Sequence, residues 1–237
     1  MEARTVEIEK IIKVPLWPLT VFSTIALGVM FLLIGYFGCT LLDDITCKAD
    51  DFPMISDILR HKYFDRVYIF AMVFHASFVQ FSNIRAYYSK FSEVIDSSTN
   101  DRLFWAGLVA CICQPMVGMV DNKMCNPVHT TFAVSFFVLI IYYFFVLLGQ
   151  IYSKGMHLLT PGQQSRATFL YYFRWVMLVF LVVTLACNII YGTNVPTPYL
   201  EWSGTLLLIN FFTVTALLDD DYMEMVGPAN QLAPLRD

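Results

Sequence analysis

The residues of this sequence that could do chemistry are polar side chains inside long apolar stretches. They comprise two histidines, two amides and one carboxylate: His75, Gln114, His129, Asn188 and Glu201. Two histidines and a carboxylate can bind zinc or transfer protons. However, the three lie far apart in the sequence, and it contains no HExxH or GxSxG motif. We therefore expect no metal and no cofactor, and treat the five residues as a candidate ligand-binding set.

The apolar stretches around these residues determine the solvent in which they act. Six stretches fill most of the chain, each close to the ~20 residues that a helix needs to cross ~30 Å of hydrocarbon. The runs are continuous, whereas strands of a membrane β-barrel alternate apolar and polar residues. The sequence predicts an all-α membrane protein, one bundle of six transmembrane helices within residues 1–237. The expected spans are 16–42, 66–88, 103–120, 129–152, 171–192 and 199–217.

Composition supports this class and excludes others. Of the 237 residues 57% are hydrophobic and 14% are charged, whereas a soluble domain carries about 25% charged residues. The chain has no polybasic run, so we expect no nucleic-acid partner. The longest segment between spans, residues 43–65, is too short to form a core of its own.

Charge distribution predicts the orientation of the bundle. Ten of the 15 Lys and Arg residues fall at the termini and in the loops that share their side. The remaining five are Lys48, Arg60, Lys62, Arg66 and Lys123. Because cytoplasmic loops carry the excess of cations, both termini are expected in the cytoplasm.

With this topology several of the candidate residues share a depth in the membrane. At 1.5 Å per residue, His75 lies roughly 14 Å below the outer edge, and His129 and Glu201 lie at the outer starts of their spans. We expect a polar pocket in the outer half, large enough for a lipid headgroup. The alternative is that each group is satisfied by a neighbouring helix or by interfacial water. Glu201 should be buried, protonated or paired, with His75, His129 or Arg66 as candidate partners.

Two cysteines fall in outer loops, where an oxidising compartment would let them form a disulfide, Cys47–Cys125. The alternative is that both are free thiols.

Local patterns predict helix starts and tails. Ser56 or Asp57 is expected to cap a short interfacial helix, Asp101 the third span, and Thr160 with Gln163 the fifth span. The N-terminal 15 residues suggest an amphipathic surface segment, and the tail after Leu218 an irregular one.

Several landmarks, taken in order, resemble one protein family. They are Pro53-Met54-Ile55-Ser56, the stretch GLVACICQPMVGMVDN followed by His129, Leu159-Thr160-Pro161, and Tyr199-Leu200-Glu201-Trp202. This pattern resembles the damage-regulated autophagy modulators, the FGF-receptor-activating protein and the Sfk proteins, most closely their GPI-anchor-remodelling branch. The Gly that often follows the first motif in the family is absent here, where Ile58-Leu59-Arg60 stands.

The resemblance implies a six-helix membrane protein but does not fix one process. Relatives act in GPI-anchor lipid remodelling in the Golgi, in autophagy at lysosomes, and in phosphoinositide-kinase recruitment at the plasma membrane. The implied location is therefore the endomembrane system (Golgi, ER or lysosome) or the plasma membrane.

Three functions follow as hypotheses. The first is a non-catalytic membrane protein that handles or senses lipid headgroups, with a membrane lipid as its partner. The second is a structural or adaptor subunit that packs against other membrane-protein subunits. The third is an intramembrane acyl hydrolase or transferase, which requires His75, His129 and Glu201 to converge.

Overall fold

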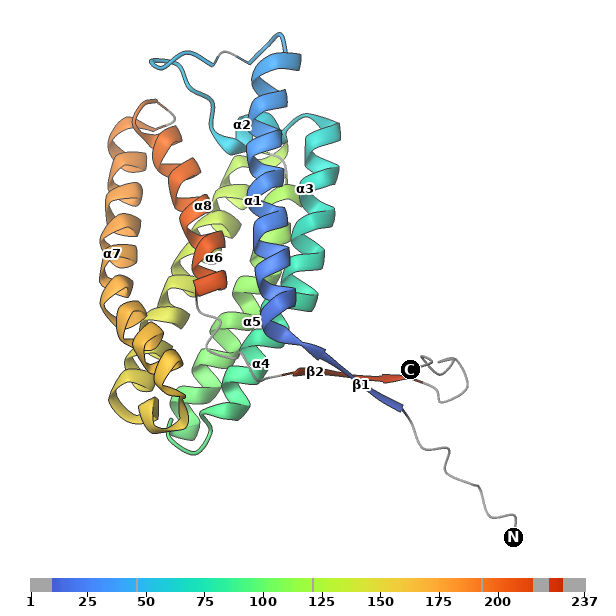
Figure 1. Ribbon diagram of the computed structural model, residues 1–237. Coiled ribbons are helices and arrows are strands. Elements are labelled where there is room, and N and C mark those ends of the chain that lie inside the picture. Colours follow the sequence, from blue (N-terminus) through green and yellow to red (C-terminus); the bar gives the residue numbers. More distant parts are fainter. Residues whose placement is uncertain (1–9, 46, 121, 193, 215–221, 228–237) are drawn as a thin grey trace.

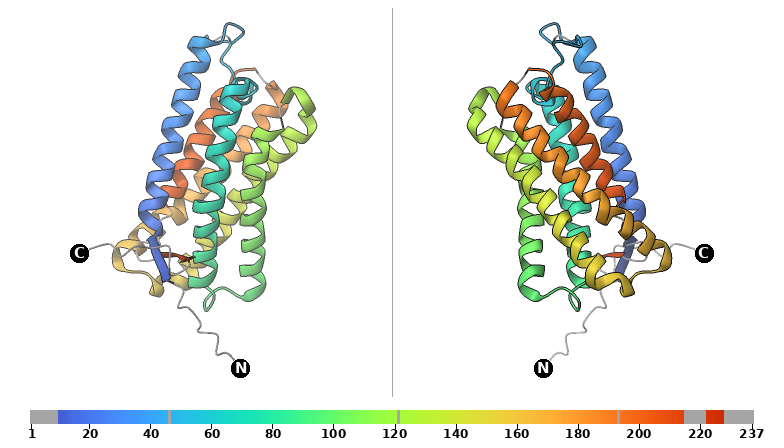
Figure 2. Two further views of the ribbon diagram at one scale, coloured as in Figure 1. Left: turned by 90° about the vertical axis from the view of Figure 1, so that its right-hand side faces the viewer. Right: turned by 90° about the vertical axis from the view of Figure 1, so that its left-hand side faces the viewer.

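The computed structural model describes residues 10–45, 47–120, 122–192, 194–214 and 222–227. Long helices run roughly side by side along a common direction (Figures 1 and 2). In chain order the elements are β1 Lys10–Pro15, α1 Leu16–Leu41, α2 Ile55–Leu59, α3 Lys62–Phe74, η1 His75–Gln80, α4 Phe81–Lys90, α5 Ser97–Met119, α6 Asn122–Gln150, η2 Ile151–Gly155, η3 Met156–Leu158, α7 Pro161–Tyr191, α8 Thr197–Val214 and β2 Tyr222–Gly227.

The protein is a helical membrane protein. In the part of the chain that the structure describes, five helical stretches are long and apolar enough to cross a bilayer, and they match the first five expected spans. They are Leu16–Leu41, Lys62–Lys90, Ser97–Met119, Cys125–Leu158 and Pro161–Tyr191. The sixth expected span corresponds to α8, whose first turns are polar and include Glu201.

Two of the spans depart from a regular α-helix. The second contains a π-helical turn, η1, between α3 and α4, a feature that often marks functional sites. The fourth has a non-helical residue at Cys125 (φ −157°, ψ 83°), shortly before Pro127. The regular part of α6 begins after this break, so Pro127 stands in its first turn, where a proline is tolerated.

The packing divides the buried side chains into two hydrophobic clusters. The larger joins α4, α5, α6 and α7, with fully buried side chains such as Phe91, Ile140 and Leu170. The smaller joins α1, α2, α3 and α8 around Phe31, Ile58 and Trp202. α8 contacts both α1 and α7 and so links the two clusters.

The chain ends form a two-stranded antiparallel ribbon, which the sequence did not predict. β1 pairs with β2 from Lys10 opposite Gly227 to Pro15 opposite Tyr222. The expectation of an irregular tail is therefore wrong for Tyr222–Gly227, whereas the surface segment before Pro15 stays a prediction. The ribbon lies at the end of the bundle where α1 begins, opposite the end that carries α2 (Figure 1). Both described ends of the chain thus lie on one side, as the even number of expected spans requires.

Helix starts differ from expectation at two of three positions. α2 begins at Ile55 after Met54, whose N–H donates to Asp57 Oδ2 at 3.2 Å, so neither Ser56 nor Asp57 is the N-cap. α5 begins earlier than expected, and its cap is Asp96 rather than Asp101. The N–H of Thr99 donates to Asp96 at 2.9 Å and holds the pKa of that carboxyl below its usual range. The capping box of Thr160 and Gln163 is confirmed.

Candidate functional site

A cavity of about 340 Å³ lies between α6, α7 and α8, with α2 at its outer end. Polar side chains line its outer part: Ser56, Asn126, His129, Thr130, Asn188, Thr197 and Glu201. Apolar side chains line its inner part, among them Phe137, Ile141, Met177, Leu181 and Leu208. The depth of each lining residue follows from its position along its helix. α6 and α8 run inward from the outer end, so their later residues lie deeper, whereas α7 runs outward and its earlier residues lie deeper. The cavity therefore changes from polar to apolar with depth.

A smaller chamber of about 60 Å³ adjoins this cavity. The two share six lining residues: Ser56, Ala133, His129, Phe137, Glu201 and Leu208. The chamber extends toward the centre of the bundle, where Gln80 and Gln114 lie beside Tyr68 and Met72. Ser56, His129 and Glu201 are the polar side chains common to both spaces.

Glu201 is held by the backbone of α2. Its Oε2 accepts the N–H of Ile55 at 3.0 Å, and the N–H of Ser56 is a second donor to the carboxylate. The first N–H groups of a helix have no partner within the helix, so a side chain of α8 supplies the acceptor that α2 lacks. The partners are backbone amides rather than the side chains of His75, His129 or Arg66 that the sequence suggested.

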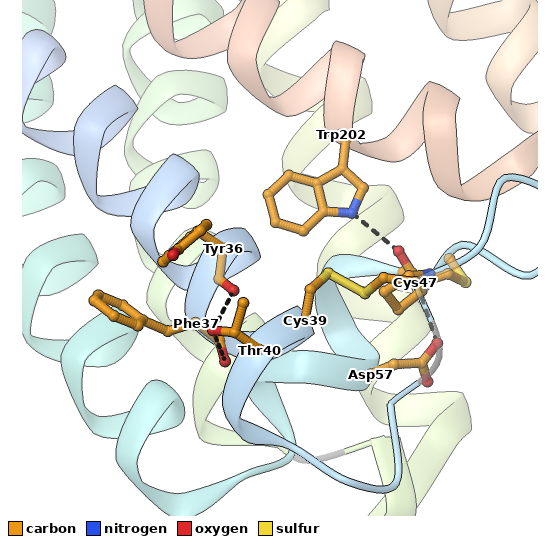
Figure 3. Close-up of a disulfide and its surroundings, with 9 residues drawn as sticks. Tyr36, Phe37, Cys39, Thr40, Cys47, Asp57 and Trp202 are labelled. Atoms are coloured by element: carbon orange, nitrogen blue, oxygen red, sulfur yellow. Dashed lines mark hydrogen bonds between the residues drawn. A yellow bond between two sulfur atoms is a disulfide. The ribbon is translucent and has the colours of Figure 1, made fainter.

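Two neighbours of Glu201 fasten the same segment. The indole Nε1 of Trp202 donates to the carbonyl of Pro53 at 3.0 Å (Figure 3). The hydroxyl of Tyr199 donates to the carbonyl of Ala49 at 3.0 Å, and its ring stacks on Phe52 with centroids 4.8 Å apart. The start of α8 thereby fixes residues 49–56 over the outer end of the cavity.

His129 has a defined orientation. Its Nδ1 lies 2.8 Å from the carbonyl oxygen of Val120. A carbonyl can only accept, so in the neutral ring Nδ1 carries the proton and Nε2 presents a lone pair. His129 lines both spaces, which makes this nitrogen an acceptor available to a ligand.

Three buried side chains at the lining have polar atoms with no hydrogen-bond partner among the described residues. In the smaller chamber these are Nε2 of Gln80 and Oε1 of Gln114, and in the larger cavity Oγ1 of Thr197. The opposite ends of both amides are engaged, since Cys111 Sγ donates to Gln80 Oε1 and Gln114 Nε2 donates to Met72 Sδ. Buried polar groups are normally hydrogen-bonded, so such atoms indicate a place where a ligand or water binds.

The sequence of the chain matches the model of a known protein family. The family model described as Frag1/DRAM/Sfk1/Cwh43P N-terminal domain matches residues 15–219. The chain belongs to this family. No curated protein and no solved structure matches the chain.

Two stretches that carried the Frag1/DRAM/Sfk1/Cwh43P resemblance meet in space. Pro53 and Ile55 of the first stretch bond to Trp202 and Glu201 of the last, although nearly 150 residues separate them. Glu201 lines the cavity, together with Met54 and Ser56 of the first stretch. The same contacts explain why an acidic residue next to an aromatic one can stand at the start of α8.

The structure brings together four of the five residues selected from the sequence. Gln114 lines the smaller chamber, Asn188 the larger cavity, and His129 and Glu201 line both. His75 lines neither, and its Nδ1 lies 2.8 Å from Ser23 Oγ on α1. Among the residues that the structure describes, no three His, Cys, Asp or Glu side chains group as metal ligands.

Sequence reasoning missed Ser56, Gln80 and Thr197 as lining residues. Gln80 carried a signal, since it is an amide inside an apolar stretch. Ser56 and Thr197 lie where a loop meets a helix, and nothing in their local sequence indicates that they face a cavity.

The expected disulfide is wrong. Cys47 bonds to Cys39 in the last turns of α1 (Figure 3). Cys125 is a free, exposed thiol. The Cα atoms of Cys39 and Cys47 are 5.6 Å apart, which lies within the range a disulfide requires. The loop after α1 turns back on itself, so Cys47 returns to the helix it has just left rather than crossing to α6.

Proposed function

We propose that this protein binds a membrane lipid in the cavity between α6, α7 and α8 without transforming it. The observation that carries the proposal is the change from polar to apolar lining with depth. A lipid has the same order, with its polar head at the membrane interface and its chains in the hydrocarbon. The volume of about 340 Å³ falls within the range of ligand pockets, roughly 300–1,000 Å³.

The construction of the walls supports the proposal. Gly204 of α8 lies so close to α7 that a Cβ there would come within 2.9 Å of Phe180 Cε1. Met54 and Ser56 line the outer end, and Tyr199, Glu201 and Trp202 hold their segment, residues 49–56, in place. Such a preformed space loses little entropy when it takes up a ligand.

The process we propose is lipid handling in GPI-anchor remodelling or membrane trafficking, within the endomembrane system or the plasma membrane. Support comes from membership of the Frag1/DRAM/Sfk1/Cwh43P family and from the resemblance of the motifs at the cavity wall. In an adaptor, by contrast, partner subunits would bind to the apolar outer faces of the helices.

A second candidate function is acyl transfer, and one observation favours it. A serine hydroxyl and a histidine with an oriented ring, Ser56 and His129, line the same two spaces. Serine and histidine are the residue types that form acyl-enzyme intermediates. Glu201 does not orient His129 in this arrangement, because its Oε2 binds the α2 amide of Ile55.

Lipid analysis of the purified full-length protein tests the proposal. Ala133 lines both spaces, so Ala133→Phe fills their junction, whereas Ala26→Phe adds the same bulk on the exposed face of α1. We expect mass spectrometry to find co-purified lipid with the wild type and Ala26→Phe, and to find only background with Ala133→Phe at equal thermal stability. Equal lipid content in all three proteins would contradict the proposal.

A further inference from the structure

The charges around the cavity narrow the class of lipid that it can hold. Among the described residues that line the two spaces, Glu201 is the one with a formal charge, and no Lys or Arg is present. The nearest cation in sequence to α2, Arg60, is directed elsewhere. Its guanidinium lies 3.5 Å from Asp44 and 3.9 Å from Asp57.

A phosphate group would find no Lys or Arg in this lining. Proteins hold phosphates with Arg, Lys or the free N–H groups of a helix start. Three helices begin at this cavity: α2, α6 and α8. The first N–H groups of α2 already donate to the carboxylate of Glu201, and the first turn of α8 contains Pro198, which has no N–H. An anionic head would therefore meet a carboxylate and neutral polar side chains rather than a cation.

The polar atoms that are available suit hydroxyl groups instead. Gln80 Nε2 can donate, Gln114 Oε1 can accept, and the Thr197 hydroxyl can do both. His129 Nε2 adds an acceptor. Phosphate oxygens that are ionised can only accept, whereas each hydroxyl both donates and accepts, so a head with free hydroxyls matches this mixture.

We infer that the ligand is an uncharged lipid with free hydroxyls on its head, of the monoacylglycerol type, rather than a phospholipid. This inference rests on the proposed function and adds the chemical class of the ligand. The hydroxyls lie at the polar end, toward Thr197 and His129, where the smaller chamber with Gln80 and Gln114 adjoins the cavity. The acyl chain extends between α6, α7 and α8 toward Met177 and Leu208.

Competition between two lipids that differ by one phosphate tests the inference. The full chain is placed in phosphatidylcholine nanodiscs with a photoreactive monoacylglycerol, and crosslinking to the protein is measured. Unlabelled monoacylglycerol and lysophosphatidic acid with the same acyl chain serve as competitors. We expect monoacylglycerol to displace the probe at an about tenfold lower concentration, equivalent to ~1.4 kcal/mol.

Variants show whether the preference arises in the cavity. Asn188→Lys adds a cation to the lining and should shift the preference toward lysophosphatidic acid by about tenfold. Asn194→Lys adds the same charge at the same end but outside the lining, and should leave the preference unchanged. Thr197→Val and Gln114→Leu should each weaken displacement by monoacylglycerol.

The outcomes separate the two proposals. Equal or stronger displacement by lysophosphatidic acid with the wild type overturns this inference while lipid binding stands. An equal shift with Asn188→Lys and Asn194→Lys overturns it as well, because the preference would then come from surface charge. Failure to crosslink the probe specifically, together with absence of co-purified lipid, overturns both proposals.

Discussion

At the scale of single residues, Glu201 shows how a carboxylate is accommodated at the edge of a membrane helix. Its oxygen accepts from the first N–H groups of α2, so the charged group and the unpaired amides satisfy one another. Trp202 adds a bond to Pro53 on the same segment. The structural and the proposed binding roles of Glu201 therefore depend on the same contact.

Substitution of Glu201 separates loss of the acceptor from loss of the charge. Glu201→Leu leaves the Ile55 and Ser56 amides without their acceptor, and we expect the free energy of unfolding to fall by about 1–3 kcal/mol. Glu201→Gln keeps a carbonyl oxygen and should cost less. Thermal unfolding of both variants in one detergent measures the difference, and equal losses would show that the acceptor does not matter.

At the scale of elements, small residues determine how closely α1 approaches α2. A Cβ on Gly38 would lie 2.6 Å from Cγ2 of Ile58, a side chain that is fully buried. Gly28 on the same helix has no atom within 4 Å of the corresponding point. One glycine of α1 is thus required by packing, while the other is not.

Matched alanine substitutions on α1 test this difference. Gly38→Ala forces α2 away from α1, and we expect a loss of about 1–3 kcal/mol in unfolding free energy. Gly28→Ala should leave stability unchanged or raise it by up to ~1 kcal/mol, because alanine favours the helix. Gly38→Ala should cost less in an Ile58→Ala background, since the opposing atoms are then absent. Unfolding midpoints of the four proteins check the prediction, and equal effects of the two glycine changes would refute it.

At the scale of the whole molecule, the two ends of the bundle differ in chemistry. The end with α2 carries the Cys39–Cys47 disulfide, and the opposite end carries the β1–β2 ribbon. Disulfides form in oxidising compartments, so this end is expected to face the lumen or the exterior. The distribution of Lys and Arg leads independently to the same orientation.

Cysteine labelling in sealed, right-side-out membranes tests the orientation. In a Cys187→Ser background, an impermeant maleimide should modify the exposed Cys125 but not Ser98→Cys at the start of α5. Cys39 and Cys47 should react only after reduction, because they are bonded to each other. Modification of Ser98→Cys before permeabilisation would establish the reverse topology.

The sequence by itself determined the helical membrane class and the five spans that are confirmed. Both can be obtained along one dimension, because the length of an apolar run and the rise per residue set how far a helix reaches across the membrane. Four of the five selected residues line the cavity or the smaller chamber that adjoins it.

The tertiary structure decided which side chains meet. The direction of a side chain around its helix axis depends on the neighbouring helices, so His75 faces Ser23 while Gln80, five residues later, lines the smaller chamber. The turn after α1 pairs Cys47 with Cys39, and the packing of α8 on α2 gives Glu201 its backbone partners. Contacts of this kind join residues that are distant in sequence, and their geometry exists only after the helices have packed.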